Sequence, residues 1–259
     1  MTGGEPMAPD VSATVSWARA VRIEFGLLGR ARRRFLLGAL ALLLAGAIYA
    51  GVQAVIGDWN KPPHDLGGVF MATLLFTVLW SGEAWRDAPA DARDWFWAQP
   101  IAQGDRELAR VLAGLGWLAL AALTLLLLQL VATAAYGQPV ILDRQTPLMS
   151  VNLVTGPVIL YLLGSIAGLR SAHPLAWILG GLAAVLTLPE ILGAGQDSAI
   201  VHAQRWIIWT LVGPFGGPTN MGVVPPGSHW GPLWLTCALG TLAAAALAAV
   251  LAARLRRPS

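Results

Sequence analysis

The sequence predicts an all-α integral membrane protein, a single domain over residues 1–259 that crosses a bilayer six times with both ends in the cytoplasm. Apolar residues make up 56% of the chain and charged residues only 12%, whereas soluble domains carry about 25% charged residues. Apolar runs long enough for a membrane helix, about 20 residues, recur along the chain. Basic residues also concentrate in alternate connections, as they do in multi-span proteins.

The positive balance points to membrane topology rather than to nucleic acid. The net charge is +3, and Lys61 is the single lysine among 17 basic residues. These residues form short clusters beside apolar runs, without the aromatic-interleaved basic groove of a nucleic-acid-binding protein. The lone Cys237 cannot form an internal disulfide.

Residues 11–34 are predicted to form an amphipathic helix in the inner membrane interface. At 100° per residue the apolar side chains fall on one side and the arginines on the other. The apolar side carries Trp17, Val21, Phe25 and Leu28, and the basic side carries Arg19, Arg22, Arg30 and Arg33. Glu24 falls on the apolar side, so we expect it to face protein. A basic anchor and a partner-docking helix both remain open.

The first three spans are predicted at 35–57, 66–82 and 108–136. The first is a true span rather than a cleaved signal, because a long segment of 34 residues precedes its apolar run. The second apolar run is short, so its helix is expected to include residues on either side of the run. The third is rich in leucine and long enough to tilt.

The last three spans are predicted at 152–169, 174–192 and 233–253. A tight turn from Arg170 to His173 separates the fourth from the fifth. Gly164 and Gly168 form a G-x-x-x-G pattern in the fourth span, which favours close helix packing. Asn152 is expected to hydrogen-bond between helices.

The arginines and the lysine orient these spans. With the N-terminus inside, 14 of the 17 basic residues lie in cytoplasmic segments, and Lys61, Arg144 and Arg205 remain outside. Lysine and arginine near span ends determine orientation. The two outer segments that hold Arg144 and Arg205 flank the fourth and fifth spans.

Residues 193–230 are predicted to form a re-entrant element in the outer leaflet. The apolar centre from Trp206 to Val212 is too short to span, and Gly-Pro clusters interrupt regular structure around it. Trp206, Trp209, Trp230 and Trp234 are expected in the outer aromatic belt.

The cytoplasmic segment 83–107 combines acidic and aromatic residues. A short helix is predicted from Asp91 to Gln99, where Pro100 stops it. Aromatic anchors supply much of the binding energy of protein interfaces, so the stretch from Asp94 to Trp97 suits docking. The alternative is a solvated loop with its tryptophans in the headgroup region.

Several kinds of catalytic chemistry lack support in the sequence. The four histidines all fall in predicted loops without metal-ligand spacing. Ser165 follows a glycine, but the sixth span has no histidine to act as its base. No G-x-x-x-x-G-K-[ST] motif exists, so the chain is not expected to bind ATP by a P-loop or to be an enzyme by itself.

The layout and the 83–107 segment together resemble the membrane subunits of ABC transporter type 2 exporters. Glu83 and Arg86 stand near that family's E-R-E position. The stretch from Ala98 to Ile101 matches its proline-centred piece, and the stretch from Asp105 to Leu108 matches its step into the third span. Pro89 stands where the family has Gly-Thr, and aromatic residues replace its leucine-rich stretch.

The resemblance implies a permease in the cell (plasma or inner) membrane that exports an amphiphilic, lipid-like, peptide or drug substrate. It also implies a second permease subunit, identical or homologous, and a soluble ATP-binding-cassette subunit that carries ATP and magnesium, with no cofactor on this chain. Residues assigned to ATPase coupling on this basis are Glu24, Glu83, Arg86, Asp91, Asp94, Trp95, Trp97, Pro100 and Arg106. The alternative is an ATPase-independent membrane protein, either an intramembrane enzyme or a scaffold.

Overall fold

The computed structural model describes residues 17–56, 66–86, 102–135, 146–171, 173–195, 198–213 and 230–255, and all regular structure within them is helical. The helices, in chain order, are α1 (Trp17–Ala31), α2 (Arg33–Ile56), α3 (Leu66–Trp85), α5 (Gln103–Ala135), α6 (Thr146–Arg170), α7 (Pro174–Ile191), α8 (Ala199–Val212) and α9 (Trp230–Arg254). The predicted all-α class is confirmed.

Four helices are long and apolar enough to cross a membrane, judged over the described ranges. They are Gln103–Leu128, Ser150–Arg170, Pro174–Ile191 and Gly231–Arg254, and Val69–Trp85 is a shorter apolar helix. A helix needs about 20 apolar residues to span the hydrocarbon. This composition is that of a membrane protein.

The helices extend beyond the predicted apolar runs. Helix α3 continues to Trp85 and α5 begins at Gln103, on either side of the 83–107 segment, while α6 begins at Thr146 and α9 at Trp230. A hydropathy pattern marks only the apolar part of a helix. Residues that are favourable in a first turn extend the helix beyond that part. Pro147 suits the start of α6, and Asp105 lies in the first turn of α5, where a carboxylate is favourable.

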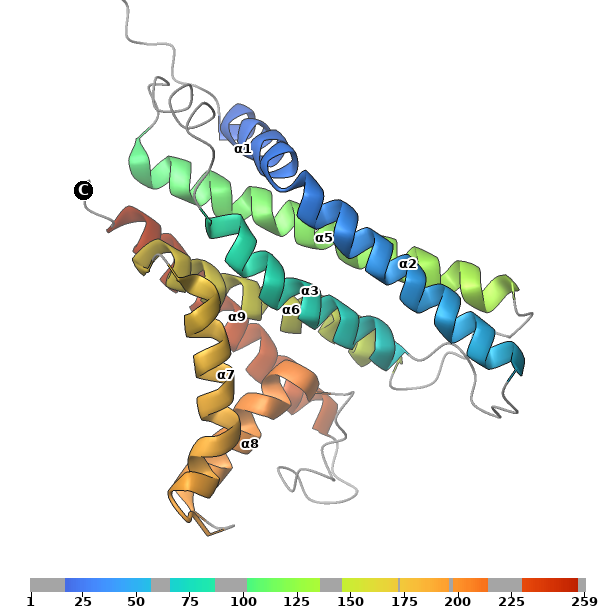
Figure 1. Cartoon of the computed structure of the whole chain (residues 1–259). Coiled ribbons are helices and arrows are strands. Elements are labelled where there is room, and N and C mark those ends of the chain that lie inside the picture. The colour runs from blue at the N-terminus through green and yellow to red at the C-terminus, as the bar shows by residue number, and fades with distance from the viewer. Residues whose placement is uncertain are drawn as a thin grey trace, which may run out of the picture.

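The predicted interfacial helix and first span form one nearly continuous rod, bent at Arg32. The Arg32 amide donates to Leu28 O at 2.9 Å, and the Leu36 amide donates to Arg32 O at 2.9 Å. The backbone hydrogen bonding therefore continues across the joint. In Figure 1, α1 lies beside the first half of α5, and α2 follows the second half.

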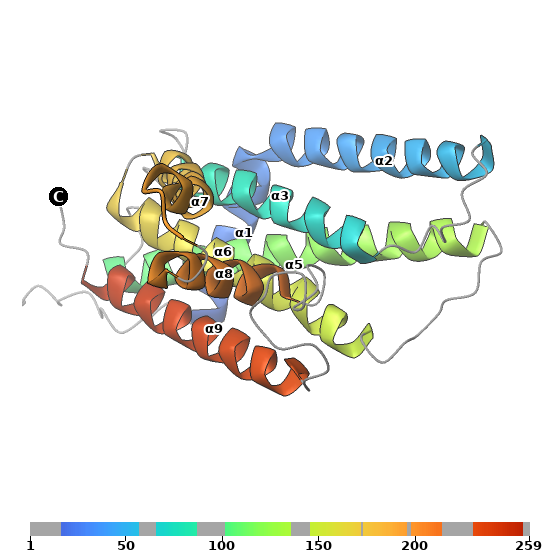
Figure 2. The ribbon, with the colours of Figure 1, turned by 90° about the horizontal axis from the view of Figure 1, so that it is seen from below.

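Helix α6 forms the centre of the bundle, between α3 and α9. It is 61% buried over its apolar window, against 17–28% for the other three membrane-length helices. Figure 2 shows α2, α3 and α5 running alongside one another, with α9 on the opposite side of the molecule. The main core cluster joins α3, α5, α6 and α9 and includes Trp80, Val111, Tyr161 and Ala249.

The predicted close packing at Gly164 and Gly168 is confirmed. A Cβ at Gly164 would lie 2.6 Å from Ser81 Cβ, and one at Gly168 would overlap the Trp85 ring. The α3 face that meets these glycines carries Thr73, Thr77 and Ser81. Each of these hydroxyls donates to the carbonyl four residues earlier, at 2.7–2.8 Å, so none is left unsatisfied in the apolar interface.

Helices α7 and α8 form an arm that diverges from the bundle and returns to it (Figure 1). Its returning end is held by side chains of α6 and α9. Asn152 Nδ2 donates to Val212 O at 2.8 Å, as expected of a helix-bridging asparagine, and Trp234 Nε1 donates to Trp209 O at 3.2 Å. Gly213 ends α8 with a φ of 41°, a conformation that favours glycine.

The predicted outer belt is wrong for two of its tryptophans. Trp209 and Trp234 are fully buried and pack with Ala238 in a small cluster. Their indoles fill the contact between α8 and α9 instead of facing headgroups. Trp206 is partly exposed and makes an edge contact with Trp209, with ring centroids 4.9 Å apart. The Trp230 side chain lies outside the described residues.

Candidate functional site

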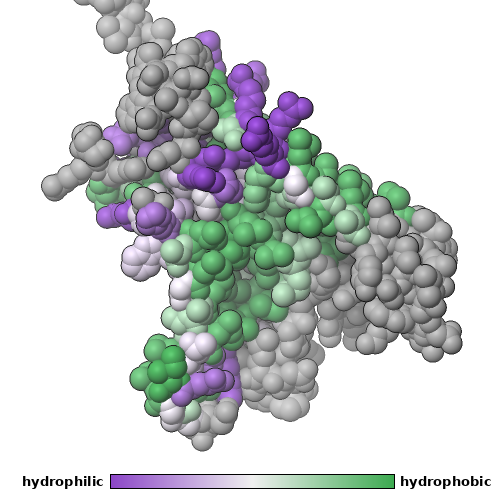
Figure 3. All heavy atoms as spheres, viewed as in Figure 1, coloured by the Kyte–Doolittle hydropathy of each residue, from purple (hydrophilic) through white to green (hydrophobic). Residues whose placement is uncertain are grey.

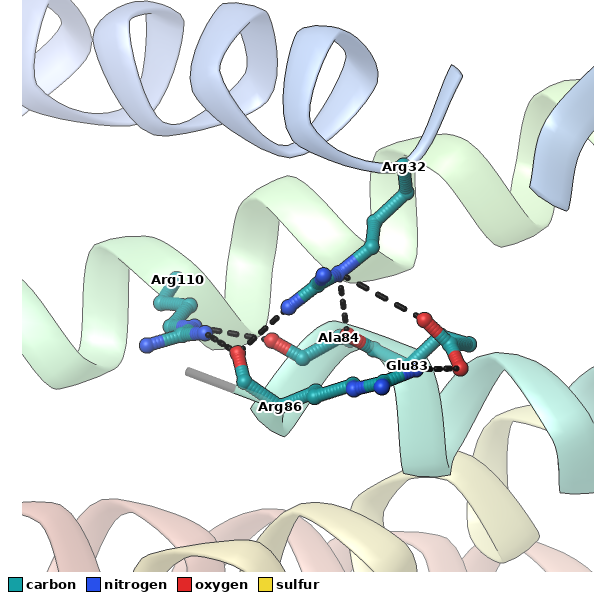
Figure 4. A network of polar contacts seen from close by, with 5 residues as sticks. All are labelled: Arg32, Glu83, Ala84, Arg86 and Arg110. Carbon is teal, nitrogen blue, oxygen red and sulfur yellow. Dashed lines mark hydrogen bonds and ion pairs between the residues drawn. The ribbon is translucent and has the colours of Figure 1, made fainter. Parts of the chain in front are cut away.

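The C-terminal end of α3 is held by two arginines from other helices (Figure 4). The last carbonyls of a helix have no partner within it. Arg32 Nε donates to Glu83 O at 2.8 Å, and its Nη2 donates to Arg86 O at 2.5 Å. Arg110 Nε donates to Ala84 O at 2.9 Å, and its Nη2 donates to Arg86 O at 3.1 Å. We call this arrangement the arginine clamp.

The geometry of the guanidinium explains why arginine occupies both positions. Its donors form a planar fork that stays charged at all physiological pH values, so one side chain can reach two carbonyls of the same helix end. Arg32 projects from the bend between α1 and α2, and Arg110 from the first part of α5. The clamp therefore joins the α1–α2 bend, the end of α3 and the beginning of α5.

Ion pairs contribute less to the clamp than its carbonyl bonds. Arg32 Nε lies 3.6 Å from Glu83 Oε2, and Arg86 Nη1 lies 3.4 Å from Glu83 Oε1. The Arg86 side chain is 72% exposed, and exposed pairs contribute about 0–1 kcal/mol. Glu83 thus contacts Arg32 and Arg86 through its carboxylate. The hydrogen bonds from Arg32 and Arg110 to backbone carbonyls hold the end of α3.

Helix α6 joins the clamp through Trp85. The Arg110 guanidinium carbon lies 5.1 Å from the centroid of the Trp85 ring, a cation–π distance. The same indole covers Gly168 of α6. A movement of the α3 end is therefore opposed by contacts to α1, α2, α5 and α6 together.

Glu24 lies on the face of α1 that packs against α5, as its position on the apolar side predicted. The residue is 8% exposed. Next to it, Phe25 stacks on Trp117 with ring centroids 4.6 Å apart, and Trp117 Nε1 donates to Phe25 O at 3.0 Å. Burial raises the pKa of Glu24 to about 7, and the positive charges of Arg110 and Arg106 oppose that rise.

Four of the nine predicted coupling residues lie at this end of the molecule. Glu83 and Arg86 belong to the arginine clamp. Glu24 and Arg106 interact electrostatically with each other. Arg110, a member of the clamp, also lowers the pKa of Glu24. Asp91, Asp94, Trp95, Trp97 and Pro100 lie outside the described residues.

Sequence reasoning missed the roles of Arg32 and Arg110, which it used only as markers of the cytoplasmic side. Their partners are backbone carbonyls, and a carbonyl partner leaves no complementary residue in the sequence. The only available signal was the position of the two arginines near the two ends of the 83–107 segment and the α1–α2 joint.

The described residues show no arrangement for metal or nucleophilic catalysis. Within them, no three histidine, cysteine, aspartate or glutamate side chains gather closely enough to hold a metal ion. Ser165 is fully buried against the bundle core and is inaccessible to a substrate from solvent.

Comparisons of the chain with models of known protein families, with curated protein sequences and with solved structures find no match.

Proposed function

We propose that this chain is the membrane-spanning permease subunit of an ATP-binding-cassette exporter of the type 2 class. It crosses the cell membrane six times, with both ends in the cytoplasm and α8 as a re-entrant element. A second permease subunit pairs with it. A separate soluble subunit hydrolyses ATP, and the pair moves an amphiphilic, lipid-like, peptide or drug substrate outward.

The arginine clamp is the observation that carries this proposal. Residues 87–101, which connect α3 to α5, contain the aromatic stretch proposed to dock on the ATPase. A displacement of that stretch would reach the end of α3 and the beginning of α5 first. Because the clamp joins both ends to the α1–α2 bend, three membrane helices would shift together, as rigid-body switching requires.

The distribution of polar surface is in accord with the proposed orientation. In Figure 3, hydrophilic side chains gather at the end of the molecule that carries α1, and hydrophobic ones cover its flank. The end of α3, the beginning of α5 and the end of α9 lie toward that same end in Figure 1. These are the ends that the six-span topology assigns to the cytoplasm.

Co-purification tests the proposal directly. The tagged full-length chain is extracted from its native membranes, and Mg-ATP hydrolysis and associated P-loop proteins are measured. We expect a co-purifying ATPase that is lost in the double variant Trp95→Ala, Trp97→Ala. Trp206→Ala serves as the control, because this tryptophan is partly exposed on α8, which the six-span topology places on the outer side.

Two results would contradict the proposal. The first is a stable monomer that never associates with an ATPase, which favours the ATPase-independent scaffold or enzyme. The second is unchanged ATPase association and transport in the double tryptophan variant, which removes the docking role of that segment.

A further inference from the structure

A long groove lies between α6, α7, α8 and α9, on the side of the molecule where α7 diverges from the bundle. Its volume is about 840 Å³. Apolar side chains such as Ile159, Leu163, Leu182 and Val185 form most of its wall. Among the described residues that line it, only Arg170, at the end of α6, is charged.

One end of the groove has the composition of a membrane–water interface. The Arg170 side chain makes no hydrogen bond or ion pair with any residue of the described ranges. Ser171 lies next to it, and its hydroxyl oxygen accepts from the His173 amide at 3.1 Å while its own proton remains available. Trp177, 67% exposed, completes this end. Arginine and tryptophan together are typical of the headgroup level.

The groove is as deep as one leaflet. From Arg170 to Ile159 the lining follows α6 for about 16 Å, at 1.5 Å per residue. Half of a bilayer's hydrocarbon core is about 15 Å. Away from Arg170 and Ser171 the lining is apolar apart from Thr210 and Thr241, and the Thr210 hydroxyl donates to Trp206 O at 2.8 Å.

We propose that this groove binds an anionic phospholipid, with its phosphate at Arg170 and its acyl chains along α6 and α7. A cation without a side-chain partner among the described residues, above an apolar slot of leaflet depth, matches the charge and the length of that molecule. A helix of a second protein copy would fill the slot but would leave the Arg170 charge uncompensated. The inference rests on the membrane location of the chain, and six-span topology places the lipid in the inner leaflet.

Lipid retention by the purified full-length chain tests this assignment. Phosphatidylglycerol and phosphatidylcholine with identical acyl chains are titrated separately, and bound lipid is counted by native mass spectrometry. We expect retention of phosphatidylglycerol over phosphatidylcholine. Arg170→Gln should lower that preference by at least about fivefold, the contribution of one basic side chain near an anionic surface. Arg254→Gln removes an exposed arginine at the end of α9, outside the groove, and should leave the preference unchanged.

Two adjacent glycines of α7 provide a matched pair that leaves all charges intact. A Cβ at Gly180 or at Gly181 meets no atom within 4 Å, so a side chain can begin at either position without a clash at its first atom. Only Gly181 lines the groove. Gly181→Leu should therefore displace the bound phosphatidylglycerol, whereas Gly180→Leu should retain it.

Four outcomes would overturn the inference. Equal retention of the two lipids, or unchanged retention in Arg170→Gln, would remove the headgroup role. Competition by glycerol 3-phosphate, which lacks acyl chains, would indicate a soluble anion. Dissociation of a dimer by Gly181→Leu without loss of lipid would make the groove a subunit interface. None of these assays needs an ATPase, so the exporter proposal and this inference can fail independently.

Discussion

At the scale of single residues, the carboxyl group of Glu24 gives the molecule a titratable contact near neutral pH. Its pKa is raised from 4.5 to about 7, chiefly by burial against α5. The folded state thus binds more protons than the unfolded state between these two values. Its contribution to stability falls as the pH rises from about 4.5 to about 7, and is constant above that range.

Glu24→Gln should remove this pH dependence. The neutral amide avoids the desolvation of a carboxylate, so the variant should be more stable than the native chain above pH 7, by on the order of 3 kcal/mol at most. Thermal unfolding in detergent at pH 5 and pH 8 measures the difference. Glu190→Gln, at an exposed position of α7, is the control. An unchanged pH slope in Glu24→Gln would show that this carboxyl is not the titrating group.

A methyl group added at Gly168 should lower the stability of the fold. A Cβ there would overlap the Trp85 ring, whereas a Cβ at Gly240 of α9 meets no atom within 4 Å. Gly168→Ala must displace an indole that also contacts Arg110, and overpacking of this kind costs about 1–3 kcal/mol. Gly240→Ala should be neutral or slightly stabilising. Equal melting temperatures for the two variants would contradict the close α3–α6 contact.

Residue-level prediction from the sequence succeeded where the helical period placed a residue out of character with its neighbours. Glu24 on an apolar face and two glycines four residues apart, Gly164 and Gly168, are patterns of this kind. All three residues lie at helix contacts in the structure. The arginine clamp could not be predicted in the same way, because Arg32 and Arg110 bind main-chain oxygens that every residue possesses.

At the scale of elements, the arginine clamp replaces the hydrogen bonds that α3 lacks at its end. Hydrogen bonds to charged groups contribute about 1.5–3 kcal/mol each. Removal of Arg110 breaks two of them and the contact with Trp85.

Arg110→Gln should therefore loosen the last turn of α3. We expect amide hydrogen exchange at residues 82–86 to accelerate at least about tenfold, as the loss of 1.5 kcal/mol implies. The α6 amides around Gly164 should be unaffected. Arg19→Gln, an exposed arginine at the beginning of α1, is the matched control. Unchanged exchange would mean that the clamp does not stabilise this helix end.

Element boundaries were harder to predict than the elements themselves. Hydropathy located every apolar run that became a helix, but α5 begins five residues before the predicted third span. Polar residues such as Asp105 and Arg106 extend a helix without altering the apolar window. The same limit explains the wrong prediction for Trp209 and Trp234. The sequence around an aromatic residue near a span end is the same whether its side chain faces headgroups or another helix.

At the scale of the whole molecule, the number of crossings distinguishes two topologies with both ends on one side. Crossing by α5, α6, α7 and α9 alone gives four spans. Adding α2 and α3 gives six, and α2, at 24 residues, is long enough for the first of these. The two topologies differ in where they place the connection between α2 and α3, which contains Lys61.

A cysteine at position 61 should therefore be labelled from outside the cell. In a Cys237→Ala background, which removes the only native thiol, Lys61→Cys in intact cells should react with a membrane-impermeant maleimide. Gly195→Cys should react in the same way, and Ser171→Cys only after permeabilisation, because both topologies place these positions alike. Labelling of Lys61→Cys only in permeabilised cells would reduce the count to four. It would also leave α2 and α3 on the cytoplasmic side, so that the clamp would hold surface helices and could not transmit movement across the membrane.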